Sequence, residues 1–262
     1  MKVDRAVRWL HISDLRCPGG DDPSWERAVT AALMRVDHVR RAWGAFDFVL
    51  VSGDLSRSGR SDELARAKRL LGDITSRLGC DERSPFVLAV PGRHDALDLA
   101  AWREWWIREI TDLPDEVTVR KDGEAGDFVA TIRLPGSGAR IGVVGLGANG
   151  RDDSLNETPA RLVERVRSLC VDPSAWAKHH HAALVVVNDA GPIVERRGEP
   201  SLRAEWRALS DHGFEVIHTG RFQGAVADPM VHDRDGMMVA RAMSFSGAGE
   251  PFGRDVETFF AQ

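Results

Sequence analysis

Five polar clusters, each following a strand-like stretch, hold the residues of this sequence that are best suited to chemistry. They read His-Ile-Ser-Asp-Leu-Arg at 11–16, Ser-Gly-Asp-Leu at 52–55, Pro-Gly-Arg-His-Asp at 91–95, Val-Val-Asn-Asp at 186–189 and Thr-Gly-Arg-Phe-Gln-Gly at 219–224. In open α/β sheets, ligands bind outside the carboxyl ends of the strands, where several loops converge. The five clusters therefore predict one shared pocket.

The side chains of these clusters point to two kinds of chemistry. Asp14 and Asp54 offer carboxylates to a divalent cation, whereas Arg16, Arg93 and Arg221 offer guanidinium groups. A guanidinium stays protonated in a protein and has no lone pair for a metal, but it pairs bidentately with carboxylate or phosphate. The arginines therefore either neutralise the two aspartates or hold a phosphorylated ligand, and the sequence leaves both alternatives open.

In order and spacing, the clusters resemble the sequence blocks of the calcineurin-like metallophosphoesterase superfamily. Those blocks read Asp-x-His, Gly-Asp, Gly-Asn-His-Asp/Glu, a His after a late strand, and Gly-His-x-His. The resemblance extends from Arg8 to Gly224. It implies an α/β fold, the four-layer α/β/β/α sandwich of mixed sheets, with a pair of metal ions that hydrolyses phosphate esters.

The resemblance also implies that most metal ligands are replaced in this chain. Asp14 and Asp54 keep their ligand positions. The other positions carry Arg16 for His, Arg93 for Asn, Asn188 for the late-strand His, and Arg221 and Gln223 for the last two His residues. A paired-metal clamp needs both sites filled. We therefore predict no dinuclear centre and expect no cofactor, although two carboxylates suffice to bind one divalent ion, such as Mn, Zn or Fe, weakly.

Two histidine features need separate interpretations. Within the resemblance, His94 and Asp95 match the proton donor of the family and the acid that orients it. Without metal-bound water this pair has little to act on, so a structural turn stands beside a catalytic role. His179, His180 and His181 suggest metal capture, but consecutive residues at the entry to a strand point in different directions, which favours a surface position.

The function predicted from these residues is that of a catalytically degenerate metallophosphoesterase-like domain. It would act as a binding, scaffold or regulatory module, with either a protein partner on another face or a phosphate-bearing ligand in the pocket. The predicted ligand-binding residues are Arg16, Arg93, Arg221, Asn188 and Gln223. The alternative is a residual metal-dependent phosphatase or phosphodiesterase that uses Asp14, Asp54 and His94.

The composition of the chain constrains its domain organisation, its partners and its location. The 262 residues, 43% hydrophobic and 29% charged, are typical of one globular domain, here 1–262, and the apolar end at 259–262 is what the N-terminal module of a longer protein would show. The formal net charge of −5 argues against general binding to nucleic acid or anionic lipid. With no signal-peptide or membrane-spanning pattern, and with three widely spaced cysteines, we expect a cytoplasmic protein with reduced thiols.

The alternation of short apolar runs with segments of helical periodicity predicts repeated βαβ units. Strands are expected at 7–12, 48–52, 86–90, 183–187 and 214–218, with a hairpin of 128–134 and 140–146 that makes the sheet arrangement mixed. Apolar stripes predict helices between them, the first one carried by Trp25, Val29, Leu33, Val36 and Trp43. A further stripe of Trp102, Trp105 and Trp106 is interpreted as core packing rather than as a stacking platform for bases.

Overall fold

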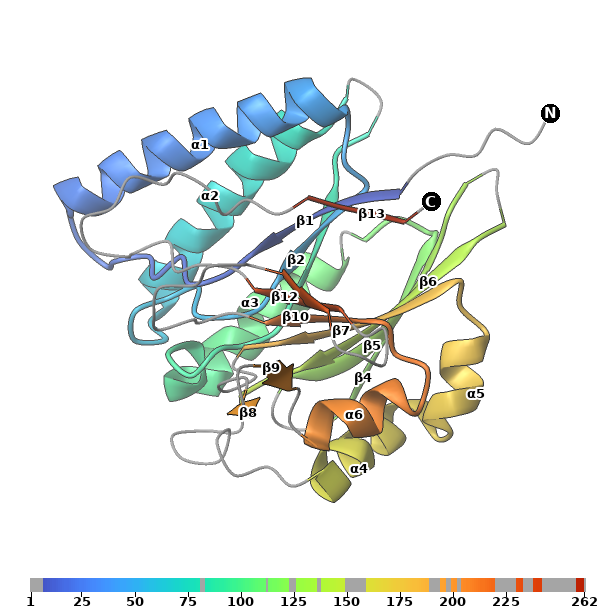
Figure 1. Cartoon of the computed structure of the whole chain (residues 1–262). Coiled ribbons are helices and arrows are strands. Elements are labelled where there is room, and N and C mark those ends of the chain that lie inside the picture. Colours follow the sequence, from blue (N-terminus) through green and yellow to red (C-terminus); the bar gives the residue numbers. More distant parts are fainter. Residues whose placement is uncertain are drawn as a thin grey trace.

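The computed structural model describes residues 7–80, 83–111, 113–122, 126–135, 138–148, 159–188, 194–196, 199–201, 204–219, 230–232, 238–241 and 258–261. Two mixed sheets lie face to face between outer helices (Figure 1). The first has the strand order β13-β1-β2-β3, made of Thr258–Ala261, Val7–Ile12, Phe48–Val51 and Phe86–Ala89. Strands β1, β2 and β3 run parallel, and β13 runs antiparallel to β1.

The second sheet has the order β11-β12-β10-β7-β6-β5-β4. Its strands are Met230–His232, Met238–Arg241, Val216–Thr219, Ala182–Val187, Arg140–Leu146, Asp127–Arg133 and Val117–Asp122. The predicted hairpin forms as the antiparallel pair of β5 and β6, and β6, β7 and β10 run parallel. A separate two-stranded ribbon joins β8 (Val194–Arg196) to β9 (Glu199–Ser201).

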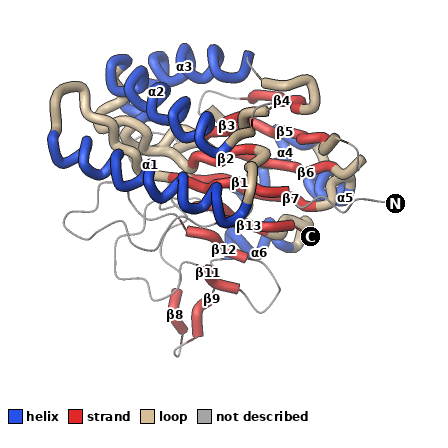
Figure 2. Tube along the Cα trace, turned by 90° about the horizontal axis from the view of Figure 1, so that it is seen from above, coloured by secondary structure: helices blue, strands red, loops and turns tan. Residues whose placement is uncertain are grey.

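Helices cover the outer face of each sheet, which completes four layers. Helices α1 (Pro23–Trp43), α2 (Ser61–Leu78) and α3 (Leu99–Thr111), the last preceded by the 3-10 turn η1 (Asp95–Asp98), lie in succession on the side of the first sheet (Figure 2). Helices α4 (Pro159–Cys170), α5 (Pro173–Lys178) and α6 (Ala204–Ser210) lie beyond the second sheet. Within the described ranges, no helix combines the length and apolar character needed to cross a membrane.

The two faces of the second sheet enter different cores, as the alternation of side chains along a strand requires. One face shares a core with the first sheet and contributes Phe128, Ala130, Ile132, Ile141, Val143, Ala182, Leu184 and Val186. The opposite face packs beneath α4 to α6 and contributes Val129, Val144, Leu146, Ala183 and Val185. The short apolar strands are therefore buried on both sides and form a rigid base for the loops at their ends.

The predicted tryptophan stripe of α3 lies in the core, as expected. Trp102, Trp105 and Trp106 are at most 7% exposed, and the ring of Trp106 lies 5.6 Å from that of Phe128 in the second sheet. The inward position predicted for Trp43 in α1 is wrong, because this side chain is 49% exposed. A helix of 21 residues is about 31 Å long, whereas six-residue β1 spans only about 20 Å, so the end of α1 extends past the sheet.

Candidate functional site

The loops that follow β1 and β2 continue to pair after the strands end. Asp14 N donates to Gly53 O (3.0 Å), Arg16 N to Asp54 O (2.9 Å) and Cys17 N to Leu55 O (2.8 Å). Because the strands are parallel, both loops leave the same edge of the sheet. The first two polar clusters of the sequence are thus fixed side by side by their backbones.

The backbone at this edge adopts a conformation that most side chains avoid. The φ angles of Asp14, Arg16 and Asp54 are 54°, 44° and 55°, in the left-handed region. Asp adopts this region more readily than most residues, whereas for Arg it is unusual. Only one further non-glycine residue of the described chain, Val171, has a positive φ, so the strain is concentrated here, as is typical of functional sites.

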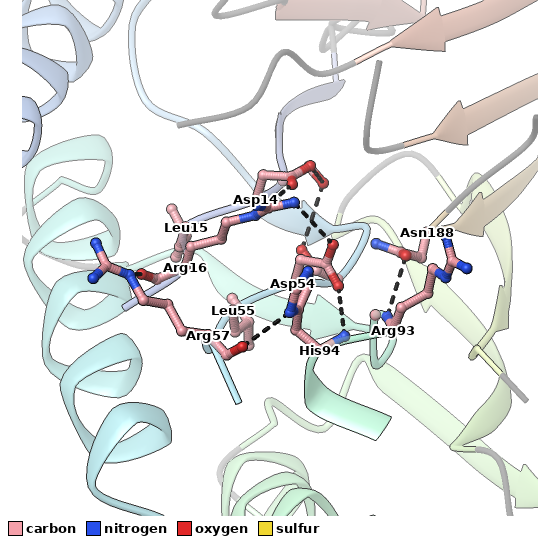
Figure 3. A network of polar contacts seen from close by, with 12 residues as sticks. Asp14, Leu15, Arg16, Asp54, Leu55, Arg57, Arg93, His94 and Asn188 are labelled. Carbon is pink, nitrogen blue, oxygen red and sulfur yellow. Dashed lines mark hydrogen bonds and ion pairs between the residues drawn. The ribbon is translucent and has the colours of Figure 1, made fainter. Parts of the chain in front are cut away.

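Arg16 lies between the two retained carboxylates (Figure 3). Its Nε donates to Asp14 Oδ1 over 3.1 Å, and its Nη2 lies 4.0 Å from Asp54 Oδ2. Both carboxylate side chains are fully buried, while the arginine side chain is 26% exposed. The guanidinium therefore holds a fixed positive charge against two buried acids.

The two oxygens of Asp54 differ in their environment. Oδ1 accepts a hydrogen bond from His94 N over 3.1 Å, which ties the β3 loop to the β2 loop. Oδ2 is buried and has no hydrogen-bond partner among the described residues. A buried acceptor without a partner is uncommon and destabilising.

Asn188 connects the second sheet to the site at the end of β7. Its Nδ2 donates to Ser52 O over 2.9 Å, and its Oδ1 accepts from Arg93 N over 3.3 Å. The side chain predicted to contact a ligand thus joins the β2 and β3 loops to β7. The guanidinium of Arg93 lies beside it (Figure 3), and the described residues include no carboxylate paired with this half-buried residue.

The predicted pairing of His94 with Asp95 is not formed. The Nδ1 of His94 donates to Arg57 O (2.9 Å), whereas Asp95 accepts hydrogen bonds from the N–H groups of Leu55, Ser56 and Gly92 and from the Ser56 hydroxyl. Four donors surround the carboxylate, and none belongs to His94. Asp95 clamps the β2 and β3 loops together instead of orienting His94.

Burial dominates the electrostatics of this clamp. It raises the pKa of Asp95 to about 6, opposed by the hydrogen bonds from Ser56 and reinforced by the charge of Asp54. Nearby, burial also raises the pKa of the Cys17 thiol to about 12, which makes this cysteine a poor nucleophile. His11, first residue of the first cluster, shares a hydrogen bond with Ser52 Oγ, and burial lowers its pKa to about 3.

Four of the five predicted clusters therefore meet at one place. Arg221 and Gln223, from the fifth cluster, lie outside the described residues, as does Asp189. The contacts of the consecutive histidines involve none of the residues of this site. His180 is hydrogen bonded to Thr131 Oγ1 and Trp176 O, and His181 accepts a hydrogen bond from Arg140 N. His180 and His181 therefore lie at the junction between α5 and the second sheet.

Two solved structures show what the chain is similar to. A putative 5'-nucleotidase from Staphylococcus aureus has 14% sequence identity and a TM-score of 0.54, and the match covers 92% of this chain but 49% of that one. A dimetal phosphatase from Danio rerio has 11% identity and a TM-score of 0.53, with 96% and 91% covered. This chain thus spans about half the length of the nucleotidase. No protein-family model and no curated protein matches the sequence.

The chain has the calcineurin-like metallophosphoesterase fold. The layer order and the position of the loops agree with the resemblance seen in the sequence blocks. At identities of 11% and 14%, the similarity establishes the fold alone. What this member of the fold does must be argued from its own site.

The described side chains do not fit the paired-metal centre that this fold implies. Arg16 fills the space between Asp14 and Asp54, and the amide oxygen of Asn188 is hydrogen bonded to the Arg93 backbone. Within the part of the chain that the structure describes, no three His, Cys, Asp or Glu side chains gather as a metal-ligand group. A guanidinium has no lone pair to replace the missing imidazole.

The described groups do not give the site a net positive charge. Arg16 and Arg93 bring two positive charges, whereas Asp14 and Asp54 bring two negative ones, and Asp95, with a pKa of about 6, adds a third carboxylate above that pH. Arg221 lies outside the described residues. The Arg57 side chain adds no further positive charge, because it forms an ion pair with Asp22.

Sequence reasoning missed two residues that shape the site. Ser56 supplies two of the four donors to Asp95, and Arg57 donates from Nε to Arg16 O over 3.1 Å while its own carbonyl accepts from His94. Both residues directly follow the Gly-Asp-Leu cluster, and this position was the only feature of the sequence that could have indicated them. Their roles depend on hydrogen bonds of backbone groups, which residue types do not reveal.

Proposed function

We propose that this chain is a metal-independent binding module that holds a phosphate-bearing ligand, built on the calcineurin-like phosphoesterase fold. Its role would be that of a scaffold or regulator rather than of a hydrolase. The observation that carries the proposal is the position of Arg16, with a guanidinium where the fold would otherwise place a cation between two aspartates.

The guanidinium of Arg16 keeps donors for a ligand while it neutralises Asp14. A guanidinium has five N–H groups, and only Nε makes a hydrogen bond to a described residue. The side chain is 26% exposed, so part of it is reachable from solvent. Pairing with aspartate therefore does not exhaust Arg16, which supports anion binding over a site that is merely plugged.

Arg93 supports the same conclusion from the β3 loop. No described carboxylate neutralises the guanidinium of this residue, which lies beside Asn188 at the end of β7 (Figure 3). A cation without a counter-charge favours an anion. Arg221, from the fifth cluster, is the third proposed contact.

The proposal is tested by isothermal titration calorimetry, in which the full chain is titrated with inorganic phosphate in the presence of a chelator. We expect binding by the wild type and a loss of about tenfold or more in Arg93→Ala, because charge-assisted hydrogen bonds are removed. Arg77→Ala is the matched control, since Arg77 pairs with Asp37 on the outer helices α1 and α2. Absence of heat with phosphate, or an Arg93→Ala variant altered only in stability, would support the plugged site instead.

A second candidate is a residual metal-dependent phosphoesterase that uses Asp14, Asp54 and His94. The observation in its favour is the buried Asp54 Oδ2, which lacks a hydrogen-bond partner and would accept a cation. This candidate predicts hydrolysis of an aryl phosphate ester that requires Mn, Zn or Fe and disappears in Asp54→Ala. Activity that is equal with and without metal, or equal in the variant, contradicts it.

A further inference from the structure

Asp54 presents one unused acceptor at the proposed anion site. Its Oδ1 accepts from His94 N over 3.1 Å, whereas Oδ2 is buried without a hydrogen-bond partner. An anion site made of arginines alone would offer donors only. The carboxylate oxygen adds an acceptor, which would pair with an anion that carries a proton and repel one that does not.

The distance across this part of the site fits one oxygen atom. Arg16 Nη2 and Asp54 Oδ2 are 4.0 Å apart, too far for a direct hydrogen bond. An oxygen placed about 2.8 Å from each would subtend an angle of about 90°, which suits a hydroxyl group. That oxygen would accept from the guanidinium and donate to the carboxylate, so it must carry hydrogen.

We infer that Asp54 makes this site selective for an oxyanion that carries its own hydroxyl group, namely hydrogen phosphate, over sulfate. The inference rests on the proposed phosphate-binding function and names the ligand more closely. Near pH 7 inorganic phosphate carries at least one proton, whereas sulfate carries none. A sulfate oxygen at the same position would face Oδ2 with two acceptors and no hydrogen between them, which is repulsive.

The experiment compares three anions on the full wild-type chain by calorimetry, near neutral pH and with a chelator present. Phosphate should bind at least about tenfold more tightly than sulfate, the loss expected for an unpaired buried acceptor. Monofluorophosphate is the matched probe, because fluorine replaces the hydroxyl of hydrogen phosphate while shape and charge are kept. It should bind as weakly as sulfate.

The variant Asp54→Asn replaces the acceptor at the Oδ2 position with a hydrogen-bond donor. The amide of His94 donates to Oδ1, so the carbonyl of the new side chain must stay there, and its NH₂ group replaces Oδ2. A donor then faces the anion. We expect the preference for phosphate to be lost, with sulfate and monofluorophosphate binding at least as well.

Asp37→Asn is the control for this variant, because Asp37 lies on α1 and pairs with Arg77. It should keep the preference of the wild type. Circular dichroism and thermal unfolding establish that each variant is folded, and the wild-type comparison of phosphate with monofluorophosphate needs no variant at all.

The outcomes separate this inference from the proposal beneath it. Equal binding of phosphate, sulfate and monofluorophosphate by the wild type would overturn the selectivity and leave anion binding intact, with a water molecule as the bridging oxygen. Absence of binding by any of the three would overturn both. Selectivity that persists unchanged in a folded Asp54→Asn variant would assign the acceptor to another residue and overturn the role of Asp54.

Discussion

Arg16 places a permanent positive charge between two buried carboxylates. Its Nε is bonded to Asp14, its Nη2 approaches Asp54, and its backbone is held in the left-handed region with φ of 44°. An arginine cannot leave, and it cannot activate water as a metal does. This one residue therefore affects both the stability and the electrostatics of the edge.

We predict that Arg16→Met destabilises the protein by about 2 kcal/mol, because two fully buried carboxylates lose their counter-charge. The value is below that of a fully buried pair, since the Arg16 side chain is 26% exposed. Urea unfolding near neutral pH measures it. Arg77→Met, which breaks a surface pair, should lose no more than about 1 kcal/mol. Equal losses would mean that the ion pair at the site contributes no more than a surface pair.

Asp95 gives stability a pH dependence of known sign. Its pKa in the folded protein is about 6, above the ordinary 3.8, so the folded state holds the proton more tightly than the unfolded chain. The stabilisation from this group is fully present below its ordinary pKa and is lost as the pH rises through about 6. The direction follows from burial outweighing the hydrogen bonds that favour the carboxylate.

Asp95→Asn removes this titration, and near pH 7 it also leaves backbone N–H groups facing an NH₂ group. We expect a loss of about 2 kcal/mol or more near neutral pH. The difference in unfolding free energy between wild type and variant should shrink as the pH rises from about 4 to about 7. Urea titrations across this range measure it. A difference that grows with pH would show that the four donors outweigh burial.

At the scale of elements, the β2 and β3 loops approach so closely that two glycines are required. A Cβ on Gly92 would lie 2.1 Å from Asp54 Oδ1 and 2.2 Å from Asp54 N. A Cβ on Gly53, whose φ is 94°, would lie 2.6 Å from Gly92 Cα. The Ser-Gly-Asp and Pro-Gly-Arg patterns of the sequence thus have a steric reason that is independent of catalysis.

Gly92→Ala should destabilise the protein by more than about 2 kcal/mol and displace His94 from Asp54, because backbone and buried atoms must move. Thermal unfolding and the phosphate titration together measure this effect. Gly72→Ala in α2 is the matched control: it has open space at Cβ and should gain about 0.5–1 kcal/mol. A Gly92→Ala variant as stable as wild type would show that the loops pack less tightly than described.

Periodicity predicted the strand at 7–12 and also four-residue strands such as β2 and β3, but it missed other elements. Helix α2 lies between predicted strands as expected, with Leu64, Ala67, Leu71, Ile74 and Leu78 buried, because a strong apolar pattern has only one face to bury. Strand β4 and helix α5 were not predicted. The first has only the alternation Val117-Thr118-Val119, and the second is a six-residue helix capped by Asp172. Strand β13 forms through pairing with β1, a contact that local sequence does not encode.

The candidate site could be predicted in its position but not in its pairing. Polar residues after strands indicated which loops converge, and Asp14, Asp54, His94 and Asn188 meet as expected. The sequence did not reveal that Arg16 pairs with Asp14 whereas Arg93 lies beside Asn188, since both depend on loop geometry. The resemblance implied that Asp95 orients His94, with a structural turn as the alternative, and the hydrogen bonds of Asp95 to Leu55, Ser56 and Gly92 agree with the turn.

At the scale of the whole molecule, the core shared by the two sheets holds the parts of the site together. Asn188 comes from the second sheet and bonds Ser52 of the first, so the site forms only when both sheets are docked. Residues 182–187 alternate between the two cores, and the sequence could not say which face meets which sheet. Fold and site are therefore expected to unfold together.

The left-handed backbone of Asp14 and Asp54 predicts that metal binding can be introduced by substitution. A variant combining Arg16→His, Arg93→Asn, Asn188→His, Arg221→His and Gln223→His returns the ligand types that the family resemblance implies. We expect it to retain about two manganese ions after desalting, because Asp14 and Asp54 keep their left-handed conformations. Adding Asp54→Ala should abolish retention. A folded variant that binds no manganese would show that the loops, and not only the side chains, have diverged.

The most direct test of the account is the metal content of the wild-type chain itself, measured by mass spectrometry after incubation with manganese, zinc and iron and subsequent desalting. With Arg16 between Asp14 and Asp54, the account predicts a metal-to-chain ratio near zero for all three metals. A ratio approaching one or two ions per chain would contradict it, because the guanidinium would then have to leave the carboxylates to a metal.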